Sequence, residues 1–355
     1  MTRQALTEPD ILVLDRNAVR AGLAGLDPVA VVEAVLREHA AGHTVLPAEA
    51  YLPWTNAVGA SARCVAMPAA VVSGRRATYG LKVINASLSN PGRGLDRAGG
   101  ITLLFDPETA RPHVLADAAL LSAVRTAAYT VASLRRLGPE VVDAVTMLGC
   151  GALARAHYEL LARYVPELRT VHVYDMDQQR ATRFARWAAR ADSVDVVIER
   201  TARAAVGATQ VLVTLTTSDE PYLAASWLRP GTFVAHVSLD DLCRDVFTTA
   251  EAVYVDDVDL VRDNPRRVLG RLMSEGVVTA PGSPVRSPAG CAVADARPLT
   301  GTLAGVLAGT DPVVRPGAGT VVSNPFGAAV LDVALLAAVV AELAPNDGHP
   351  RLRLA

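Results

Sequence analysis

The stretch Gly149-Cys-Gly-Ala-Leu-Ala154 stands directly between an apolar run, Ala144–Leu148, and a segment with helical periodicity, Ala152–Tyr164. It has the form GxGxxA, in which small residues allow the backbone to approach a pyrophosphate closely. The phosphates would then lie at a helix N-terminus, where free N–H groups and the helix dipole attract negative charge. Glycine turns are common, but the position between a strand and a helix predicts a dinucleotide-binding turn. The residues expected to contact the dinucleotide are Gly149, Gly151, Ala152 and Leu153.

The chain after this motif alternates between short apolar runs and helical segments. The expected helices are Ala152–Tyr164, Gln178–Ala191 and Arg203–Val206. The expected strands are Ala144–Leu148, Thr170–Tyr174, Val194–Ile198, Val211–Thr216, Thr232–Val237 and Ala252–Val255. Strands separated in this way indicate βαβ units and a parallel sheet, so residues 129–317 are predicted to form a Rossmann-like domain. The segment Thr279–Thr300 is rich in Pro, Gly and Ala and is expected to be a loop.

An acidic residue ends the second of these strands. A carboxylate at Asp175 can accept hydrogen bonds from the ribose 2′- and 3′-hydroxyls of adenosine, and it repels a 2′-phosphate. NAD is therefore the expected cofactor, although Arg180 is near enough in the sequence to leave NADP open. Three polar residues at the end of a later strand are predicted to contact the ribose or the nicotinamide: Thr216, Thr217 and Ser218.

The first part of the chain has a different pattern. Asp27 can cap a helix that has Pro28 in its first turn. Short apolar runs separated by Gly and Pro then predict a β-rich domain that binds the substrate. Its expected strands are Ala62–Met67, Tyr79–Ile84, Ile101–Phe105 and His113–Leu115, and its expected later helices are Ala118–Leu137 and Ala328–Leu343. Residues 1–128 and 318–355 are assigned to this domain, and the fold class is α/β.

The composition excludes several classes of protein. The 355 residues are 51% hydrophobic and 20% charged, with a net charge of −2, which permits a sizeable core and leaves no basic stripe for nucleic acid. The first ten residues lack the apolar core of a signal peptide, and the longest apolar run is interrupted by Asp332. A cytoplasmic protein without membrane association is therefore expected. The scattered cysteines and histidines lack metal-ligand spacing, so no metal is expected.

Three further runs carry a resemblance to a known family: Gly80-Leu-Lys-Val-Ile-Asn85, Leu103-Leu-Phe-Asp106 and Ala123-Val-Arg-Thr-Ala-Ala128. With the glycine motif at Gly149, and in this order, they resemble the ornithine cyclodeaminase/mu-crystallin family over nearly the whole chain. The resemblance implies an NAD-dependent oxidoreductase acting on the C–N bond of a small amino-acid-derived substrate. It also implies a homodimer formed through the β-rich domain, and a nicotinamide pocket lined by Asn324.

Within this family the chain is most similar to the dehydrogenases of 2,3-diaminopropionate biosynthesis, which supply secondary metabolism. The similar stretches are Ala62–Pro68, His236–Leu242 and Ser323–Gly327. They imply oxidative cleavage of N-(2-amino-2-carboxyethyl)-glutamate to 2,3-diaminopropionate and 2-oxoglutarate. The family's cyclodeaminases carry a glutamate where this chain has Val65, which disfavours cyclisation of ornithine or lysine. The resemblance is also compatible with a ketimine reductase, an amino-acid dehydrogenase or a non-catalytic NAD(P)H-dependent binding protein.

The resemblance also implies roles for individual residues. Lys82 is expected to contact the substrate carboxylate or carbonyl and to stabilise developing charge. Arginine dominates the cationic residues of this chain, so a lysine at this position is not expected to be incidental. Arg125, with Arg63 as a second candidate, is expected to bind substrate carboxylates. The proton-transfer residue is expected to be Asp240 or Asp241, which follow the strand Thr232–Val237, and Asp240 is favoured.

Overall fold

The computed structural model divides the chain into two compact units: Met1–Arg125 with Ala329–Ala355 (unit 1), and Thr126–Ala328 (unit 2). The sequence placed the second boundary near residue 318. The difference arises because β17 (Val321–Asn324), which was not predicted, pairs with two strands of unit 2. The structure describes residues 10–74, 76–190, 194–282, 296–343 and 348–353.

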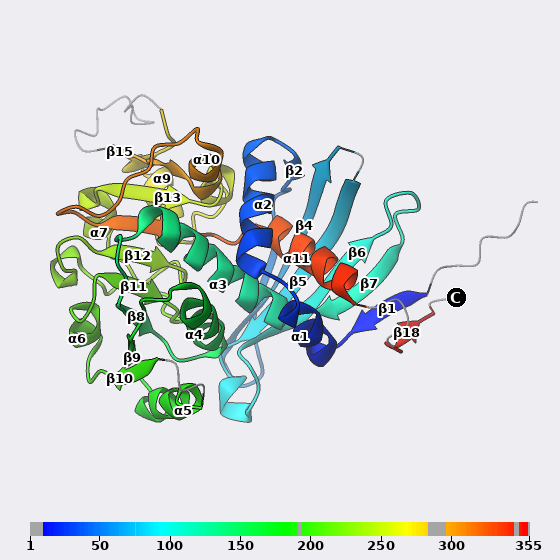
Figure 1. Cartoon of the computed structure of the whole chain (residues 1–355), viewed down its shortest axis with the longest axis horizontal. Helices are drawn as coiled ribbons and strands as arrows, with labels where there is room; N and C mark the ends of the chain where they lie inside the picture. Colours follow the sequence, from blue (N-terminus) through cyan, green and yellow to red (C-terminus); the bar gives the residue numbers. More distant parts are fainter. Residues whose placement is uncertain (1–9, 75, 191–193, 283–295, 344–347, 354–355) are drawn as a thin grey trace, which may run out of the picture. The chain divides into compact units, whose positions relative to one another are not determined.

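A largely antiparallel sheet forms the centre of unit 1 (Figure 1). Its strands are β1 (Ile11–Leu14), β2 (Thr44–Val45), β3 (Ala50–Thr55), β4 (Ser61–Ser73), β5 (Arg76–Ser87), β6 (Ala98–Phe105), β7 (Pro112–Asp117) and β18 (Arg351–Leu352). They follow the order β18-β1-β7-β6-β5-β4-β2, and β3 also pairs with β4. The four predicted strands fall within β4 to β7. These strands extend beyond their apolar runs because β4 and β5 pair along almost their whole length.

Helices cover one face of this sheet. They are α1 (Arg16–Ala24), α2 (Pro28–Ala40) and α11 (Ala329–Glu342). A 3-10 turn, η1 (Pro91–Arg93), lies in the connection between β5 and β6. The Asp27 side chain accepts a hydrogen bond from the Ala30 N–H at 3.0 Å, which confirms the predicted cap. The helix α11 packs on β4, β5 and β6 and against α2 (Figure 1). A Cβ at Gly80 would lie 2.7 Å from a methyl group of Val333, so glycine permits this close packing.

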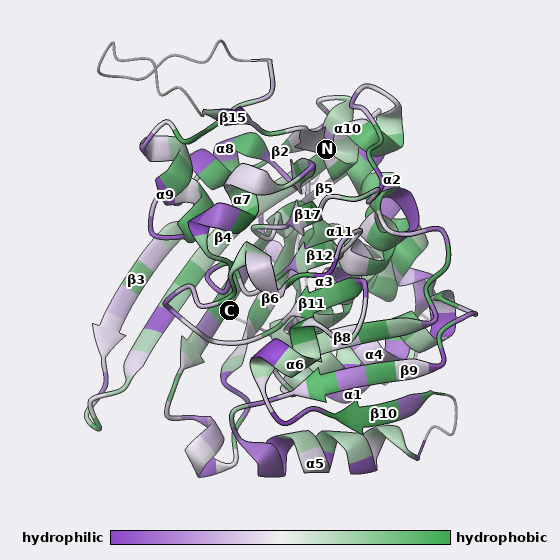
Figure 2. Cartoon of the chain, turned by 90° about the vertical axis from the view of Figure 1, so that its left-hand side faces the viewer, coloured by the Kyte–Doolittle hydropathy of each residue, from purple (hydrophilic) through white to green (hydrophobic). Residues whose placement is uncertain are grey.

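Unit 2 is built on a parallel sheet, as the sequence predicted. Its strands are β8 (Ala144–Leu148), β9 (Thr170–Tyr174), β10 (Asp195–Ile198), β11 (Val211–Thr214), β12 (Phe233–His236), β13 (Ala252–Val255), β16 (Gly301–Thr302) and β17. The order β10-β9-β8-β11-β12-β17-β13-β16 contains the 3-2-1-4-5 arrangement of the Rossmann fold. The central strands β8 and β11 are mostly hydrophobic and buried (Figure 2). The prediction of a Rossmann-like domain is confirmed.

The helices of unit 2 include both predicted and unexpected elements. The helix α3 (Ala118–Leu137) begins in unit 1 and continues into unit 2. The others are α4 (Ala152–Tyr164), α5 (Gln178–Ala188), α6 (Ala202–Val206), α7 (Arg244–Thr249), α8 (Val258–Arg262), α9 (Val268–Ser274), α10 (Leu303–Ala308) and η2 (Ala225–Trp227). The predicted loop Thr279–Thr300 lies partly outside the described residues, and its ends belong to a short parallel pair, β14 (Val278–Thr279) and β15 (Arg297–Pro298). Within the described ranges, no helix has the length and hydropathy needed to cross a membrane.

Candidate functional site

The glycine turn after β8 lies tightly against the end of β11. Gly149 has a φ of 96°, and a Cβ built on it would lie 2.6 Å from the carbonyl oxygen of Leu215. The Gly149 N–H donates to the carbonyl of Tyr174 at 2.8 Å, and the Leu215 N–H donates to the carbonyl of Leu148 at 2.7 Å. Glycine is therefore required at position 149. The turn lies where the strand order reverses, which is where sheets of this kind bind ligands.

The N-terminus of α4 is free to receive an anion. Gly151 is the N-cap, with a φ of −88°, and among the described residues no side chain caps the helix. A Cβ at Gly151 would meet no described atom within 4 Å. Gly151 and Ala152 are exposed and Leu153 is half-buried. The first N–H groups of the helix, with its dipole, fit the pyrophosphate of a dinucleotide.

A carboxylate is held beside this turn. Asp175 follows β9, and its Oδ2 accepts from the Cys150 N–H at 2.9 Å while its Oδ1 accepts from the Asp177 N–H at 2.9 Å. Burial, with a further contribution from Asp175, raises the pKa of the Cys150 thiol to about 12, so this side chain stays a neutral thiol. Arg180 lies 3.9 Å from Asp177. The carboxylate of Asp175 is thus oriented by the backbone of the turn itself.

The two aspartates after β12 have different surroundings. Asp241 is fully buried, and its carboxylate accepts hydrogen bonds from the hydroxyls of Thr216 and Ser238. Tyr222 also hydrogen-bonds to it, but burial dominates and raises the pKa of Asp241. A buried carboxyl group with a raised pKa keeps its proton to higher pH than an exposed one, which suits a group that transfers protons.

Asp240, by contrast, is paired with a cationic side chain. It is buried, forms an ion pair with Arg267, and its Oδ1 accepts from the Val268 N–H at 3.1 Å at the start of α9. The preceding Leu239 has a φ of 76°, an uncommon conformation for a residue with a side chain. Of the other polar residues predicted at the end of β11, Thr217 is exposed and Ser218 donates to the carbonyl of Glu220 at 2.7 Å.

A histidine fixes the orientation of Asn324. His236 Nε2 accepts from the backbone N–H of Asp241 at 3.2 Å, so its Nδ1 carries the proton and donates to Asn324 Oδ1 at 2.7 Å. Burial lowers the pKa of His236 to about 4, which keeps the ring neutral. The Asn324 Nδ2 is buried and finds no acceptor among the described residues. A donor in this state suits a carbonyl oxygen of a bound ligand.

Unit 1 contains a buried cluster of charges. Lys82 on β5 is 2% exposed, and its Nζ lies 2.8 Å from Oδ2 of Asp332, which is fully buried on α11. The Nε of Arg125, on α3, lies 3.1 Å from the same oxygen. Burial lowers the pKa of Lys82. Two cations sharing one carboxylate leave a net positive charge, which suits a carboxylate ligand.

Arg63 lies on a neighbouring strand of the same sheet. It is half-buried on β4 and lies on the same face of the sheet as Lys82, since Met67 is the register partner of Lys82 and Arg63 is four residues from Met67. That spacing corresponds to about 13 Å along a strand. Thr102, the register partner of Lys82 on β6, is buried, and its Oγ1 has no hydrogen-bond partner among the described residues. The structure therefore brings Lys82 and Arg125 together and leaves Arg63 further along the face.

Several site residues were not found from the sequence. Asp332 was used only as an interruption of an apolar run, although a buried carboxylate in the first turn of such an apolar helix is itself a signal. Arg267 and His236 gave no comparable signal, because their partners are distant in sequence. Asp256 accepts hydrogen bonds from the N–H groups of the loop at residues 326–328, which follows Asn324.

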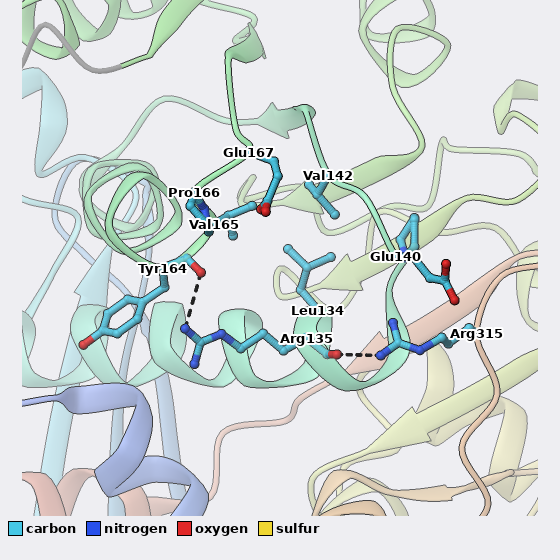
Figure 3. A pocket seen from close by; sticks show the side chains of 10 residues that line it. Leu134, Arg135, Glu140, Val142, Tyr164, Val165, Pro166, Glu167 and Arg315 are labelled. Carbon is cyan, nitrogen blue, oxygen red and sulfur yellow. Dashed lines mark hydrogen bonds between the residues drawn. The ribbon is translucent and has the colours of Figure 1, made fainter.

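A pocket of about 300 Å³ in unit 2 is lined by none of the predicted site residues (Figure 3). Arg135 donates to the carbonyl of Tyr164 at 3.3 Å, and Arg315 donates to the carbonyl of Arg135 at 2.8 Å and to that of Gly138. These arginines satisfy carbonyl groups at helix ends, including the C-terminus of α3. Their contacts are structural, and we assign this pocket no part in the site.

The fold and the glycine turn define a dinucleotide-binding protein of the Rossmann type. The model of the ornithine cyclodeaminase/mu-crystallin family matches residues 10–343, and the chain belongs to this family. This confirms the resemblance stated from the sequence.

Individual relatives give a finer comparison. The chain is 31% identical over 244 residues to N-((2S)-2-amino-2-carboxyethyl)-L-glutamate dehydrogenase of Staphylococcus aureus, covering 68% of this chain and 72% of the relative. It is 29% identical over 136 residues to the ketimine reductase mu-crystallin of Mus musculus, covering 38% and 41%. The crystal structure of CmnK superposes with a TM-score of 0.89 at 54% identity, covering 98% of this chain and 99% of that one.

Proposed function

We propose that this protein is an NAD-dependent oxidoreductase that cleaves N-(2-amino-2-carboxyethyl)-glutamate to 2,3-diaminopropionate and 2-oxoglutarate. The observation that carries the proposal is the buried cluster of Lys82, Arg125 and Asp332, whose net positive charge suits a substrate carboxylate. The similarity to the Staphylococcus aureus dehydrogenase supports the choice of substrate. The reaction consumes NAD⁺ and one water, and it yields NADH, a proton and the two products.

The residues of unit 2 fit NAD. The N-terminus of α4 would hold the pyrophosphate, Asp175 the adenosine ribose, and the unpaired Nδ2 of Asn324 the nicotinamide carboxamide. When bound, NAD⁺ supplies the acceptor for a hydride from the carbon that bears the secondary amine. Asp175 supports NAD over NADP, because a carboxylate repels a 2′-phosphate.

The chain's own residues bind the substrate and move protons. Lys82 and Arg125 hold a carboxylate and so orient the C–N bond. We assign proton transfer to Asp241, which takes a proton as the amine loses one and returns it when water cleaves the C–N bond. The raised pKa of Asp241 supports this assignment, while the ion pair with Arg267 ties Asp240 to a positioning role. This choice departs from the preference for Asp240 drawn from the sequence.

A homodimer through unit 1 is also proposed. The face of the sheet opposite α11 carries apolar side chains that are only partly buried in the single chain, including Tyr79 and Ile101, each 37% exposed. Such a continuous apolar face is typical of a protein interface. Ile101→Asp is expected to give a monomer in light scattering, and Val141→Asp, at a 70% exposed position of unit 2, serves as the control. A monomeric wild-type protein would contradict this proposal.

The activity is tested with pure protein, NAD⁺ and N-(2-amino-2-carboxyethyl)-glutamate. NADH and 2-oxoglutarate are expected to appear in equal amounts. Lys82→Ala is expected to abolish turnover while NADH still binds, as followed by its fluorescence. If wild-type protein binds NADH but does not turn over this substrate, the substrate assignment is wrong, and cyclic imines are tested next as substrates of a ketimine reductase. If Lys82→Ala keeps full activity, the role of the cluster is refuted.

A further inference from the structure

Of the 34 lysine and arginine residues in the chain, Lys82 is the only lysine, and the rest are arginines. A guanidinium stays charged at any physiological pH, whereas the pKa of an amine shifts readily on burial. The single position that retains an amine is also one of the most deeply buried charged positions. A cation whose charge depends on its surroundings therefore occupies this buried position, so the groups that control its proton matter.

Asp332 contacts both cations of the cluster. Its Oδ2 lies 2.8 Å from Lys82 Nζ and 3.1 Å from Arg125 Nε, while its Oδ1 is buried and accepts no hydrogen bond from the described residues. Asp332 precedes Val333, whose side chain packs over Gly80 on the same face of β5 as Lys82. The close packing of α11 on β5 therefore fixes the carboxylate beside the amine.

The charged groups that face Lys82 have opposing effects. Asp332 from α11 favours the ammonium form, whereas Arg125 from α3 disfavours it. Glu49, which is half-buried and directly precedes β3, favours the ammonium form more weakly. Burial of the Lys82 amine disfavours its charged form. Asp332 is thus the main group that keeps Lys82 charged in a site that otherwise favours the neutral amine.

We propose that Asp332 is a positioning residue that keeps Lys82 protonated and holds its ammonium group beside Arg125 for a substrate carboxylate. Asp332 acts through Lys82 and Arg125 and does not itself contact the reacting atoms. The inference rests on the proposed function for the identity of the ligand. Its electrostatic part concerns this chain alone and can be tested without turnover.

The direct test is a titration of Lys82 by NMR in protein labelled with ¹³Cε-lysine, where a single lysine gives a single side-chain resonance. Asp332→Asn is expected to move the titration midpoint to lower pH by about 1 unit or more, which is at least tenfold in proton affinity. Glu49→Gln is the matched control, with a smaller shift. Asp332→Glu keeps the charge and is expected to restore most of the midpoint. If the amide variant does not fold, Asp332→Ala takes its place.

A second readout separates this role from a purely structural one. In Asp332→Asn the alkaline limb of kcat/KM is expected to move to lower pH with the NMR midpoint, so that the loss relative to the wild type grows as the pH rises. A structural role would lower kcat/KM by the same factor at every pH. An unchanged midpoint in the neutral variant overturns the inference. If the midpoint shifts but the wild-type protein does not turn over the proposed substrate, the inference about Asp332 is supported and the proposed substrate is wrong.

Discussion

The conformation of Gly149 makes its replacement by alanine a demanding test of the dinucleotide site. A left-handed backbone costs a residue with a side chain on the order of 1–2 kcal/mol. The new Cβ would also lie 2.6 Å from the Leu215 carbonyl oxygen, so the backbone must shift, at a further cost of roughly 1–3 kcal/mol. A total of roughly 2–5 kcal/mol lowers the Tm of a unit of this size by about 4–20 °C. The variant is expected to lose NADH binding as well.

Gly151→Ala is the matched control, because Gly151 has a φ of −88° and open space around its Cβ position. It is expected to cost less than about 1 kcal/mol in the free energy of unfolding. It should nevertheless weaken NADH binding, since a methyl group would separate the pyrophosphate from the helix N-terminus. Thermal unfolding without cofactor and a fluorescence titration with NADH measure both effects. A Gly149→Ala protein with the wild-type Tm and NADH affinity would refute the assignment of this turn.

Three other predictions concern unit 2. Asp175→Ser is expected to raise the ratio of kcat/KM for NADPH over NADH by at least about tenfold, because the repulsion of a 2′-phosphate is removed. Asp241→Asn is expected to lower kcat about 10²–10⁴-fold with NADH binding retained, whereas Asp240→Asn mainly lowers the Tm. Burial lowers the pKa of His157 and His236 from 6.5 to about 4, so the unfolded chain binds more protons between these values. The free energy of unfolding, measured with urea, should therefore fall from pH 6.5 to about 4, by on the order of 3 kcal/mol for each ring.

Each of these predictions has a clear contrary result. An unchanged cofactor preference after Asp175→Ser would remove the physical argument for NAD. If Asp240→Asn loses more activity than Asp241→Asn, proton transfer belongs to Asp240. A variant with both His157 and His236 replaced by Gln should show a flatter dependence of stability on pH, and an unchanged slope would mean that other groups cause it.

Local signals in the sequence were sufficient to predict the bounds of an element that has a clear hydrophobic pattern of its own. The helices α3 and α4 and the strands β8 and β9 have the predicted bounds, because apolar runs and glycine or proline residues mark their ends. The short strand β17 was missed because its four residues lack such a pattern. It is a strand because β12 and β13 supply hydrogen-bonding partners on both sides.

The sequence by itself determined the Rossmann-like domain, the glycine turn at Gly149 and the candidate cations Lys82 and Arg125. The domain and the turn are encoded in short stretches whose spacing reflects the geometry of a strand, a turn or a helix, whereas the two cations were found through the resemblance to a known family. Only the tertiary structure distinguished Asp240 from Asp241, since neighbouring residues in one loop acquire different partners from distant segments. It also placed Asp332 against Lys82, 250 positions apart in sequence, because the packing of α11 on β5, and no local pattern, brings the two side chains together.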